Sequence, residues 1–158
     1  MSDITQQIID VTSTDTGEAM AVSVTYPDDG QWHPTIAMIM DAPGMRESLY
    51  EFARRLAGEG YRVVLPDLHH RHGRLLGWEA NELTPEAREK LGQVFNTMTD
   101  AGIQQDLDDA LAAIELTDDE KLGTIGFCLG ARAIYRTLMR LPDRFCLLYT
   151  SPSPRDRG

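Results

Sequence analysis

The feature that most constrains the fold of this chain is a regular alternation of short apolar runs with segments of helical periodicity. Continuous apolar runs suit strands that are covered on both faces, as in a parallel sheet. Between these runs, apolar residues recur at the spacing of one helix face. The expected strands are 36–40, 61–66 and 121–127, and the expected helices are 49–57, 85–98, 103–114 and 131–141.

Two β-rich runs, residues 4–11 and 20–26, precede this alternation and are separated by turn-forming residues, which predicts a β-hairpin. A hairpin followed by alternating strands and helices predicts the α/β class, with an open, doubly wound and mostly parallel sheet. Ligands of such sheets bind beyond the carboxyl ends of the strands. Here the expected parallel strands end at Asp41, Asp67 and Cys128, so we expect these residues to face one crevice.

A cysteine between two glycines lies where the third parallel strand is expected to run into a helix. Gly126, Cys128 and Gly130 fit the nucleophile elbow, a sharp turn that presents a reactive atom and needs small neighbours. The N-terminus of the following helix favours a thiolate, and the Leu129 N–H is placed to receive an oxyanion. The alternative is a small cysteine buried beneath the helix. The paired glycines favour the nucleophile.

Composition argues against several classes of partner. The 158 residues suffice for one domain, and 15 Lys and Arg against 25 Asp and Glu give a net charge of -10 without a basic cluster. Nucleic acids and anionic membranes are therefore not expected partners.

No secretory leader or bilayer-length segment is recognisable, so a cytoplasmic location is expected. The two cysteines, Cys128 and Cys146, lack disulfide or metal-site patterning, so a functional thiol is expected to be free.

Two segments resemble the dienelactone hydrolase family of α/β-hydrolases. "GFCLGARA" is similar to the family's nucleophile motif, and "MDAPGMRESLYEFARRLAGEGYRVVLPDLHHRHG" resembles a segment in which an acidic residue ends a strand, a Gly-containing turn follows and the next strand closes with Pro-Asp-Leu. The resemblance covers residues 4–145. It implies an α/β-hydrolase fold, which is incomplete in this chain. It also implies an enzyme that hydrolyses a small-molecule ester or lactone, typically a dienelactone, and that needs no metal or organic cofactor.

The resemblance also implies roles for individual residues. Cys128 would be the nucleophile, and the backbone amides of Ala42 and Leu129 would form the oxyanion hole. Asp41 takes the place of the family's glutamate, which engages the nucleophile in the resting enzyme, although aspartate is one methylene shorter. Arg88 is a candidate, by approximate position, for the arginine that holds an anionic substrate.

The rest of the catalytic triad is not recognisable. In α/β-hydrolases the aspartate and histidine follow the nucleophile, whereas all the histidines here precede Cys128. They are His33, His69, His70 and His72. The final residues, "CLLYTSPSPRDRG", resemble the in-frame translation of a sequencing-library adapter, with a disordered Ser/Pro-rich terminus as the alternative. We therefore expect residues 1–145 to be the N-terminal part of one hydrolase domain. Residues 146–158 are expected to be a non-native tail that forms no strand. Without the rest of the triad, the chain is expected to be inactive.

Several alternatives remain open from the sequence. The histidine-rich segment "HHRHG", residues 69–73, suggests either a metal site or a polar loop at the rim of the crevice, and the lack of spaced ligand pairs favours the loop. Asp67 either orients that loop or caps it. For the whole chain, the alternatives to an esterase or lactonase are a redox-sensitive protein whose Cys128 reacts with peroxide, and a non-catalytic α/β binding domain.

Overall fold

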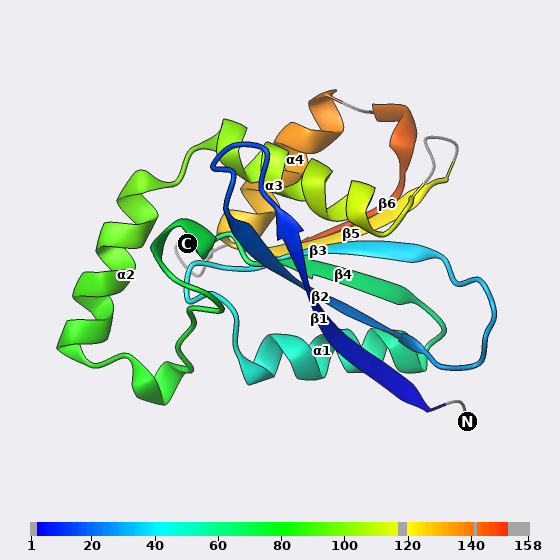
Figure 1. Cartoon of the computed structure of the whole chain (residues 1–158), viewed down its shortest axis with the longest axis horizontal. Helices are drawn as coiled ribbons and strands as arrows, with labels where there is room; N and C mark the ends of the chain where they lie inside the picture. Colours follow the sequence, from blue (N-terminus) through cyan, green and yellow to red (C-terminus); the bar gives the residue numbers. More distant parts are fainter. Residues whose placement is uncertain (1–2, 117–119, 141, 152–158) are drawn as a thin grey trace.

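The computed structural model describes residues 3–116, 120–140 and 142–151, which form a six-stranded sheet with helices on both faces (Figure 1). The order of the strands is β1-β2-β4-β3-β5-β6. Their bounds are β1 (Ile4–Thr12), β2 (Ala19–Pro27), β3 (Thr35–Ile39), β4 (Arg62–Pro66), β5 (Leu122–Phe127) and β6 (Phe145–Ser151). The predicted α/β class is confirmed.

The pairing of the strands brings the expected crevice residues to one edge of the sheet. β1 and β2 form the predicted antiparallel hairpin, and β2 is also antiparallel to β4. β3 lies between β4 and β5 and is parallel to both. The carboxyl ends of these three strands, which lead to Asp41, Asp67 and Cys128, therefore point toward the same edge.

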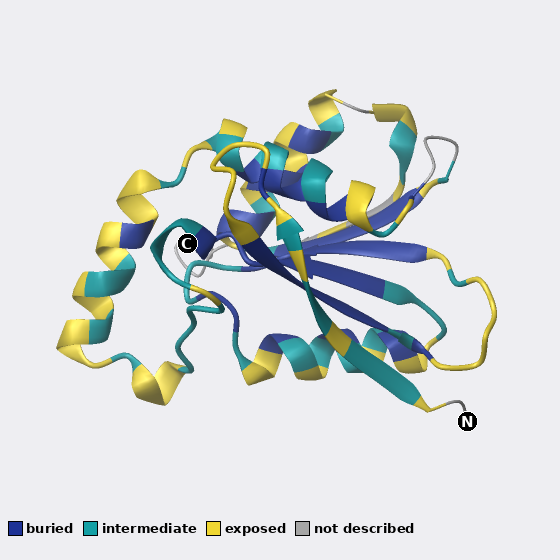
Figure 2. Ribbon diagram, in the orientation of Figure 1, coloured by how far each residue is buried: buried dark blue, intermediate teal, exposed yellow. Residues whose placement is uncertain are grey.

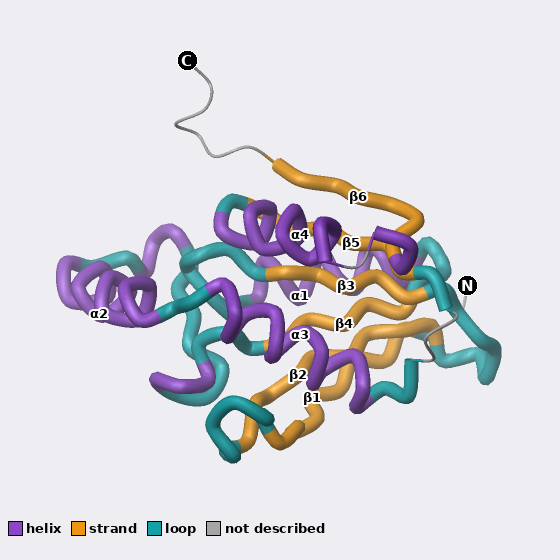
Figure 3. Tube along the Cα trace, turned by 90° about the horizontal axis from the view of Figure 1, so that it is seen from above, coloured by secondary structure: helices purple, strands orange, loops and turns teal. Residues whose placement is uncertain are grey.

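The helices lie on both faces of the sheet and beyond one end of it. They are α1 (Glu47–Gly58), α2 (Pro85–Thr97), α3 (Asp100–Ala113) and α4 (Leu129–Arg140), with 3-10 turns η1 (His70–His72), η2 (Ala80–Glu82) and η3 (Pro142–Arg144). α1 covers one face and α3 and α4 cover the other (Figures 1 and 3), while α2 lies beyond the end at which β3 and β4 finish. None of the helices in the described ranges is both long enough and apolar enough to cross a membrane.

The core explains why the central strands have continuous apolar sequences. Every residue of β3 is buried, and so are four of the five residues of β4, because helices cover both faces (Figure 2). The main apolar cluster joins β3, β4 and β5 to α1, α3 and α4, with Met38, Leu65 and Ile134 among its fully buried members. A smaller cluster of Met20, Val22, Val24, Val64 and Ala110 lies under the hairpin.

The prediction that no strand follows residue 145 is wrong. Phe145–Ser151 forms β6, which pairs in parallel with β5 from Leu122 opposite Phe145 to Phe127 opposite Ser151. The sequence "FCLLYT" is apolar and β-prone, and β5 offers unpaired backbone groups along its edge. The origin of residues 146–158 stays a prediction, and 152–158 lie outside the described residues.

Candidate active site

Cys128 forms the turn between β5 and α4. Its backbone φ is +52°, in the left-handed region that residues with a side chain rarely adopt. Its thiol is free and the residue is exposed, so the alternative of a cysteine packed beneath the helix is wrong. A strained turn that presents an exposed side chain is the geometry of a nucleophile elbow.

The two flanking glycines are required by close approaches of the backbone. A Cβ atom on Gly126 would lie 2.6 Å from the carbonyl carbon of Gly130. A Cβ atom on Gly130 would lie 2.5 Å from the carbonyl oxygen of Ile39 and 2.9 Å from that of Met40. Backbone atoms cannot retreat as a flexible side chain can, so α4 packs against β5 and the end of β3 only because both positions lack side chains.

The same contact places two backbone amides in one neighbourhood. Since Gly130 touches the carbonyls at the end of β3, the first turn of α4 lies beside the chain that leads to Ala42. Among the described residues, neither the Ala42 amide nor the Leu129 amide donates a hydrogen bond. Two unengaged N–H groups near an elbow suit an oxyanion hole, which is the role predicted for them.

Arg46 engages Asp41, an interaction that sequence reasoning missed. Nη1 of Arg46 donates to Oδ1 of Asp41 at 2.5 Å, and Nη2 donates to Oδ2 at 2.9 Å. Arg46 also donates from Nη1 to the carbonyl of Gly44 at 3.0 Å, and its Nε lies 3.6 Å from Oε2 of Glu79. Both carboxylate oxygens of Asp41 are thus held by one guanidinium. The predicted role of Asp41 beside Cys128 stays a prediction, and no hydrogen bond joins the two in the described structure.

The turn after β3 is held by the loop that follows β4. The Met45 amide donates to the Leu76 carbonyl at 2.9 Å, and Gly44 and Gly77 form an isolated bridge. A Cβ atom on Gly77 would lie 1.7 Å from the Met45 carbonyl oxygen, so this contact also requires a glycine. The loop therefore fixes the turn that contains the Ala42 amide.

Asp67 orients that loop, which settles one of the alternatives left open by the sequence. The residue is fully buried, and its carboxylate accepts the His69 amide at 3.0 Å and the Leu75 amide at 2.6 Å. Leu75 has a φ of +56° and so depends on such support. Burial raises the pKa of Asp67 to about 6, while the two amide hydrogen bonds and the electrostatic influence of the nearby His70 and Arg74 act in the opposite direction.

The interpretation of residues 69–73 as a polar rim is wrong for His69 and His70, which are both buried. Neither ring nitrogen of His69 has a hydrogen-bond partner among the described residues, and burial lowers the pKa of His69 to about 4. Nε2 of His70 lies 3.1 Å from Oδ1 of the buried Asp106 on α3. In the described part of the chain, no three metal-ligating side chains gather as an ion site requires.

The other singled-out side chains have separate partners. Nε2 of His72 lies 2.6 Å from Oγ1 of Thr97 at the end of α2. Arg88 is exposed on α2, beyond the carboxyl ends of β3 and β4 (Figure 1), and donates to the Leu83 carbonyl at 3.0 Å. Its role toward an anionic substrate stays a prediction. His33 precedes β3, at the opposite edge of the sheet from Cys128.

Curated relatives share part of this sequence. A protein of Methylorubrum extorquens named "Putative carboxymethylenebutenolidase" is 33% identical over 109 residues, which cover 67% of this chain and 35% of that protein. A protein of Yersinia pestis with the same name is 26% identical over 119 residues, which cover 73% of this chain and 42% of that protein. The chain therefore spans between 35% and 42% of the length of these relatives.

The fold is also that of solved hydrolases. The crystal structure of a "Putative Dienelactone Hydrolase" from Klebsiella pneumoniae subsp. pneumoniae superposes with a TM-score of 0.75 at 24% identity, covering 96% of this chain and 62% of that one. The model of the dienelactone hydrolase family matches residues 20–146, which include the elbow and the turn after β3. This chain therefore belongs to the dienelactone hydrolase family.

Proposed function

We propose that this chain carries the nucleophile of a hydrolase that cleaves small-molecule carboxylic esters or lactones through Cys128. The observation that carries the proposal is the left-handed backbone of an exposed Cys128 between two glycines that admit no side chain. A cysteine with only a packing role needs none of these features. The two curated relatives are named for a butenolide, an unsaturated lactone, which supports a lactone as the substrate class.

The chemistry begins with attack of the Cys128 thiolate on the carbonyl carbon of the substrate. A C–S bond forms, and the electron pair of the C=O bond moves to oxygen, where the Ala42 and Leu129 amides donate to it. Collapse of this intermediate breaks the ester C–O bond, and the leaving oxygen takes a proton. In a lactone the resulting alcohol stays attached to the acyl group. Water then attacks the thioester, the C–S bond breaks, and the carboxylic acid, the thiolate and one proton are released; this proton balances the one that the leaving oxygen took.

Turnover needs a base with a pKa near 7, and each histidine of this chain is either buried with a lowered pKa or in contact with another group. His69 is buried with a pKa lowered to about 4, and His70 faces Asp106. His72 lies against Thr97, and His33 contacts the Gly60 carbonyl at 3.1 Å at the opposite edge of the sheet. We therefore infer that the triad's aspartate and histidine come from residues outside this sequence. The chain alone should form the thioester but hydrolyse it slowly.

The test is acyl transfer from p-nitrophenyl acetate, followed by nitrophenolate release and by mass spectrometry of the peptides. We expect one acetyl group per chain on Cys128, released with a matching burst of nitrophenolate. Cys146 is a second exposed thiol on β6 and serves as the internal control. Cys128→Ser should abolish the burst, whereas Cys146→Ser should leave it unchanged.

Equal acetylation of both thiols would overturn the proposal, because it would show that the elbow gives Cys128 no advantage. A separate treatment with hydrogen peroxide distinguishes the redox hypothesis. Selective oxidation of Cys128 without acyl transfer from the ester would favour a redox-sensitive thiol instead.

A further inference from the structure

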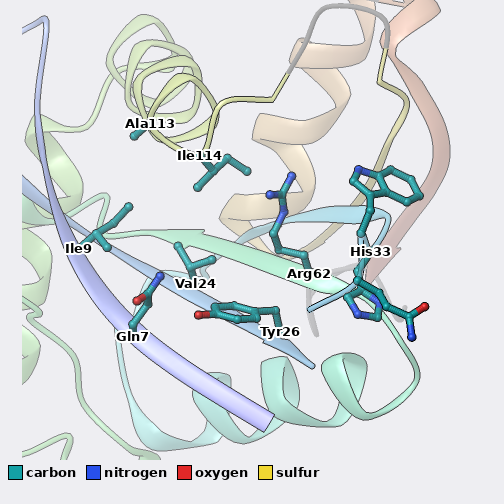
Figure 4. Close-up of a pocket in the computed structure, with 10 residues that line it drawn as sticks. Gln7, Ile9, Val24, Tyr26, His33, Arg62, Ala113 and Ile114 are labelled. Carbon is teal, nitrogen blue, oxygen red and sulfur yellow. The ribbon is translucent and has the colours of Figure 1, made fainter. Parts of the chain in front are cut away.

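A cavity, shown in Figure 4, lies at the amino ends of the parallel strands. The edge of the sheet that carries Cys128 is the opposite one. The volume of the cavity is about 400 Å³, within the range of small-molecule sites. Arg62, which begins β4, and Trp32 and His33, which precede β3, contribute to its lining. The five residues of β4 span about 17 Å at about 3.3 Å per residue, so a small ligand in this cavity does not reach the elbow.

The cavity has an apolar floor and aromatic walls. Ile9 on β1, Val24 on β2 and Ile114 at the end of α3 supply aliphatic surface. The Tyr26 ring lies beside them, and Figure 4 shows the side chain of Arg62 extending from β4 toward Ile114. Such a lining suits a flat apolar ligand whose polar group meets one charged side chain.

Arg62 is held in place but keeps its terminal nitrogens free. Its Nε donates to Oγ1 of the buried Thr35 at 2.9 Å, which orients the guanidinium plane. Within the described residues, Nη1 and Nη2 of Arg62 make no hydrogen bond or ion pair. By contrast, Arg46, Arg71 and Arg140 each pair with a carboxylate. An oriented guanidinium with two open N–H groups is the binding geometry for a carboxylate.

The acidic residues beside the cavity are themselves engaged. Asp29 lies 2.8 Å from Nε2 of His33, and Glu120 accepts the indole N–H of Trp32 at 2.8 Å. The second contact also positions the Trp32 side chain, which is 67% exposed at the cavity. Neither carboxylate is paired with Arg62 in the described structure.

We propose that this cavity is a non-catalytic binding site for a small aromatic carboxylate. The carboxylate accepts hydrogen bonds from Nη1 and Nη2 of Arg62, and the ring lies over Val24 and against Tyr26. The side-chain amide of Gln7, also in the lining, is available to a polar substituent of the ring. The inference does not depend on the proposed hydrolase activity, because Cys128 takes no part in this site.

The experiment is a titration of the whole chain with 2-naphthoate, followed by ¹H–¹⁵N NMR, with neutral 2-naphthamide as the matched probe. We expect a saturable shift of the Trp32 indole resonance, with Trp78 as the internal reference. Naphthamide should bind at least about tenfold more weakly, since a neutral amide lacks the charge that strengthens a hydrogen bond to Arg62. Equal binding of the two probes, or no saturable shift at Trp32, would overturn the proposal.

Variants locate the site. Arg62→Gln should weaken naphthoate binding by about tenfold or more, because the bidentate contact is lost. Arg55→Gln removes the same charge from an exposed position on α1 and should leave binding unchanged. Gln7→Trp fills the cavity from an exposed position on β1, keeps Arg62, and should also weaken binding. Unchanged binding in Gln7→Trp would overturn the proposal even if Arg62→Gln fails to fold.

Discussion

Gly126 and Gly130 shape the elbow through the side chains that they lack. In both cases an added Cβ would meet backbone atoms at 2.6 Å or less, so the clash could be relieved only by moving α4 away from the sheet. Gly92, inside α2, has no atom within 4 Å of an added Cβ. Gly126 and Gly130 are therefore required for packing, whereas Gly92 only lowers the stability of its helix.

Gly130→Ala should lower the free energy of unfolding by about 1–3 kcal/mol, because an added methyl overpacks the contact with Ile39 and Met40. Gly92→Ala is the matched control and should raise the free energy of unfolding by about 0.5–1 kcal/mol. Urea titrations followed by circular dichroism measure both. If both substitutions changed the free energy of unfolding in the same direction, this account of the elbow would be contradicted.

The buried Asp67 and His69 should have opposing effects on stability as pH changes. The pKa of Asp67 is raised from 3.8 to about 6, so the folded state binds an extra proton between these values and stability falls as pH rises. The pKa of His69 is lowered from 6.5 to about 4, so the unfolded state binds the extra proton there and stability rises with pH. In the native chain the two opposing effects on the free energy of unfolding largely cancel where the two ranges overlap, between pH values of about 4 and 6.

Single substitutions should expose each slope. In Asp67→Asn the free energy of unfolding should rise more steeply with pH than in the native chain, by up to about 1.4 kcal/mol per pH unit. In His69→Phe it should instead fall more steeply with rising pH, between about 4 and 6. Urea unfolding across this range tests both, and curves parallel to that of the native chain would show that these groups do not titrate as their burial implies.

At the scale of elements, one buried carboxylate ties the loop after β4 to α3. Asp106 is fully buried and accepts hydrogen bonds from Arg71 at 2.7 and 3.0 Å, while His70 lies 3.1 Å away. Arg71 also donates to Asp15, in the turn between β1 and β2, at 2.6 Å. Three segments distant in sequence thus meet at one ion-pair network.

Asp106→Asn should lower the free energy of unfolding by about 3 kcal/mol, because it leaves Arg71 and His70 without their buried partner charge. Asp108→Asn, on the same helix, removes only the partly exposed pair with Arg140 and should cost less than about 1 kcal/mol. Denaturant unfolding of the two variants provides the comparison. Equal losses would mean that the buried network contributes no more than a surface pair.

Local signals made most elements predictable from the sequence. Thr84 as the N-cap and Pro85 in the first turn mark the start of α2 in the sequence itself, and the glycines around Cys128 predict the elbow. The burial of His70 could not be predicted, because its partner Asp106 lies 36 positions along the chain. The position of β4 between β2 and β3 could not be predicted either, because it also depends on partners that are distant in the sequence. The apolar character of residues 145–150 favours a strand, whereas the resemblance of residues 146–158 to a translated adapter predicts none, and the structure has β6 there.

The two faces of the sheet are covered unequally. A cavity of about 340 Å³ lies between α1 and the strands β5 and β6. Its lining is mainly apolar, with Phe52 and Leu56 from α1, Phe127 from β5 and Tyr149 from β6. The rings of Phe52 and Phe127 meet edge to face at 5.6 Å, and Tyr149 is 56% exposed at the cavity. This face should therefore bind apolar dyes.

The dye 8-anilinonaphthalene-1-sulfonate should bind the native chain and become fluorescent. Tyr149→Glu should reduce that fluorescence severalfold, because it places a charge beside the apolar cavity. Tyr135→Glu is the matched control, since Tyr135 is 64% exposed on α4 and lies outside this lining. Equal fluorescence in the two variants would show that the dye binds elsewhere.

The contact between Gly130 and the end of β3 also has an evolutionary consequence. The backbone of α4 rests directly on the carbonyls of Ile39 and Met40, so this contact does not depend on the side chains that surround the elbow. Mutations in those side chains can therefore leave the contact between α4 and the end of β3 undisturbed. For the proposed hydrolase, such a scaffold would allow a lineage to explore new substrates while it keeps the proposed oxyanion hole, and the two glycines are the positions that have to stay without a side chain.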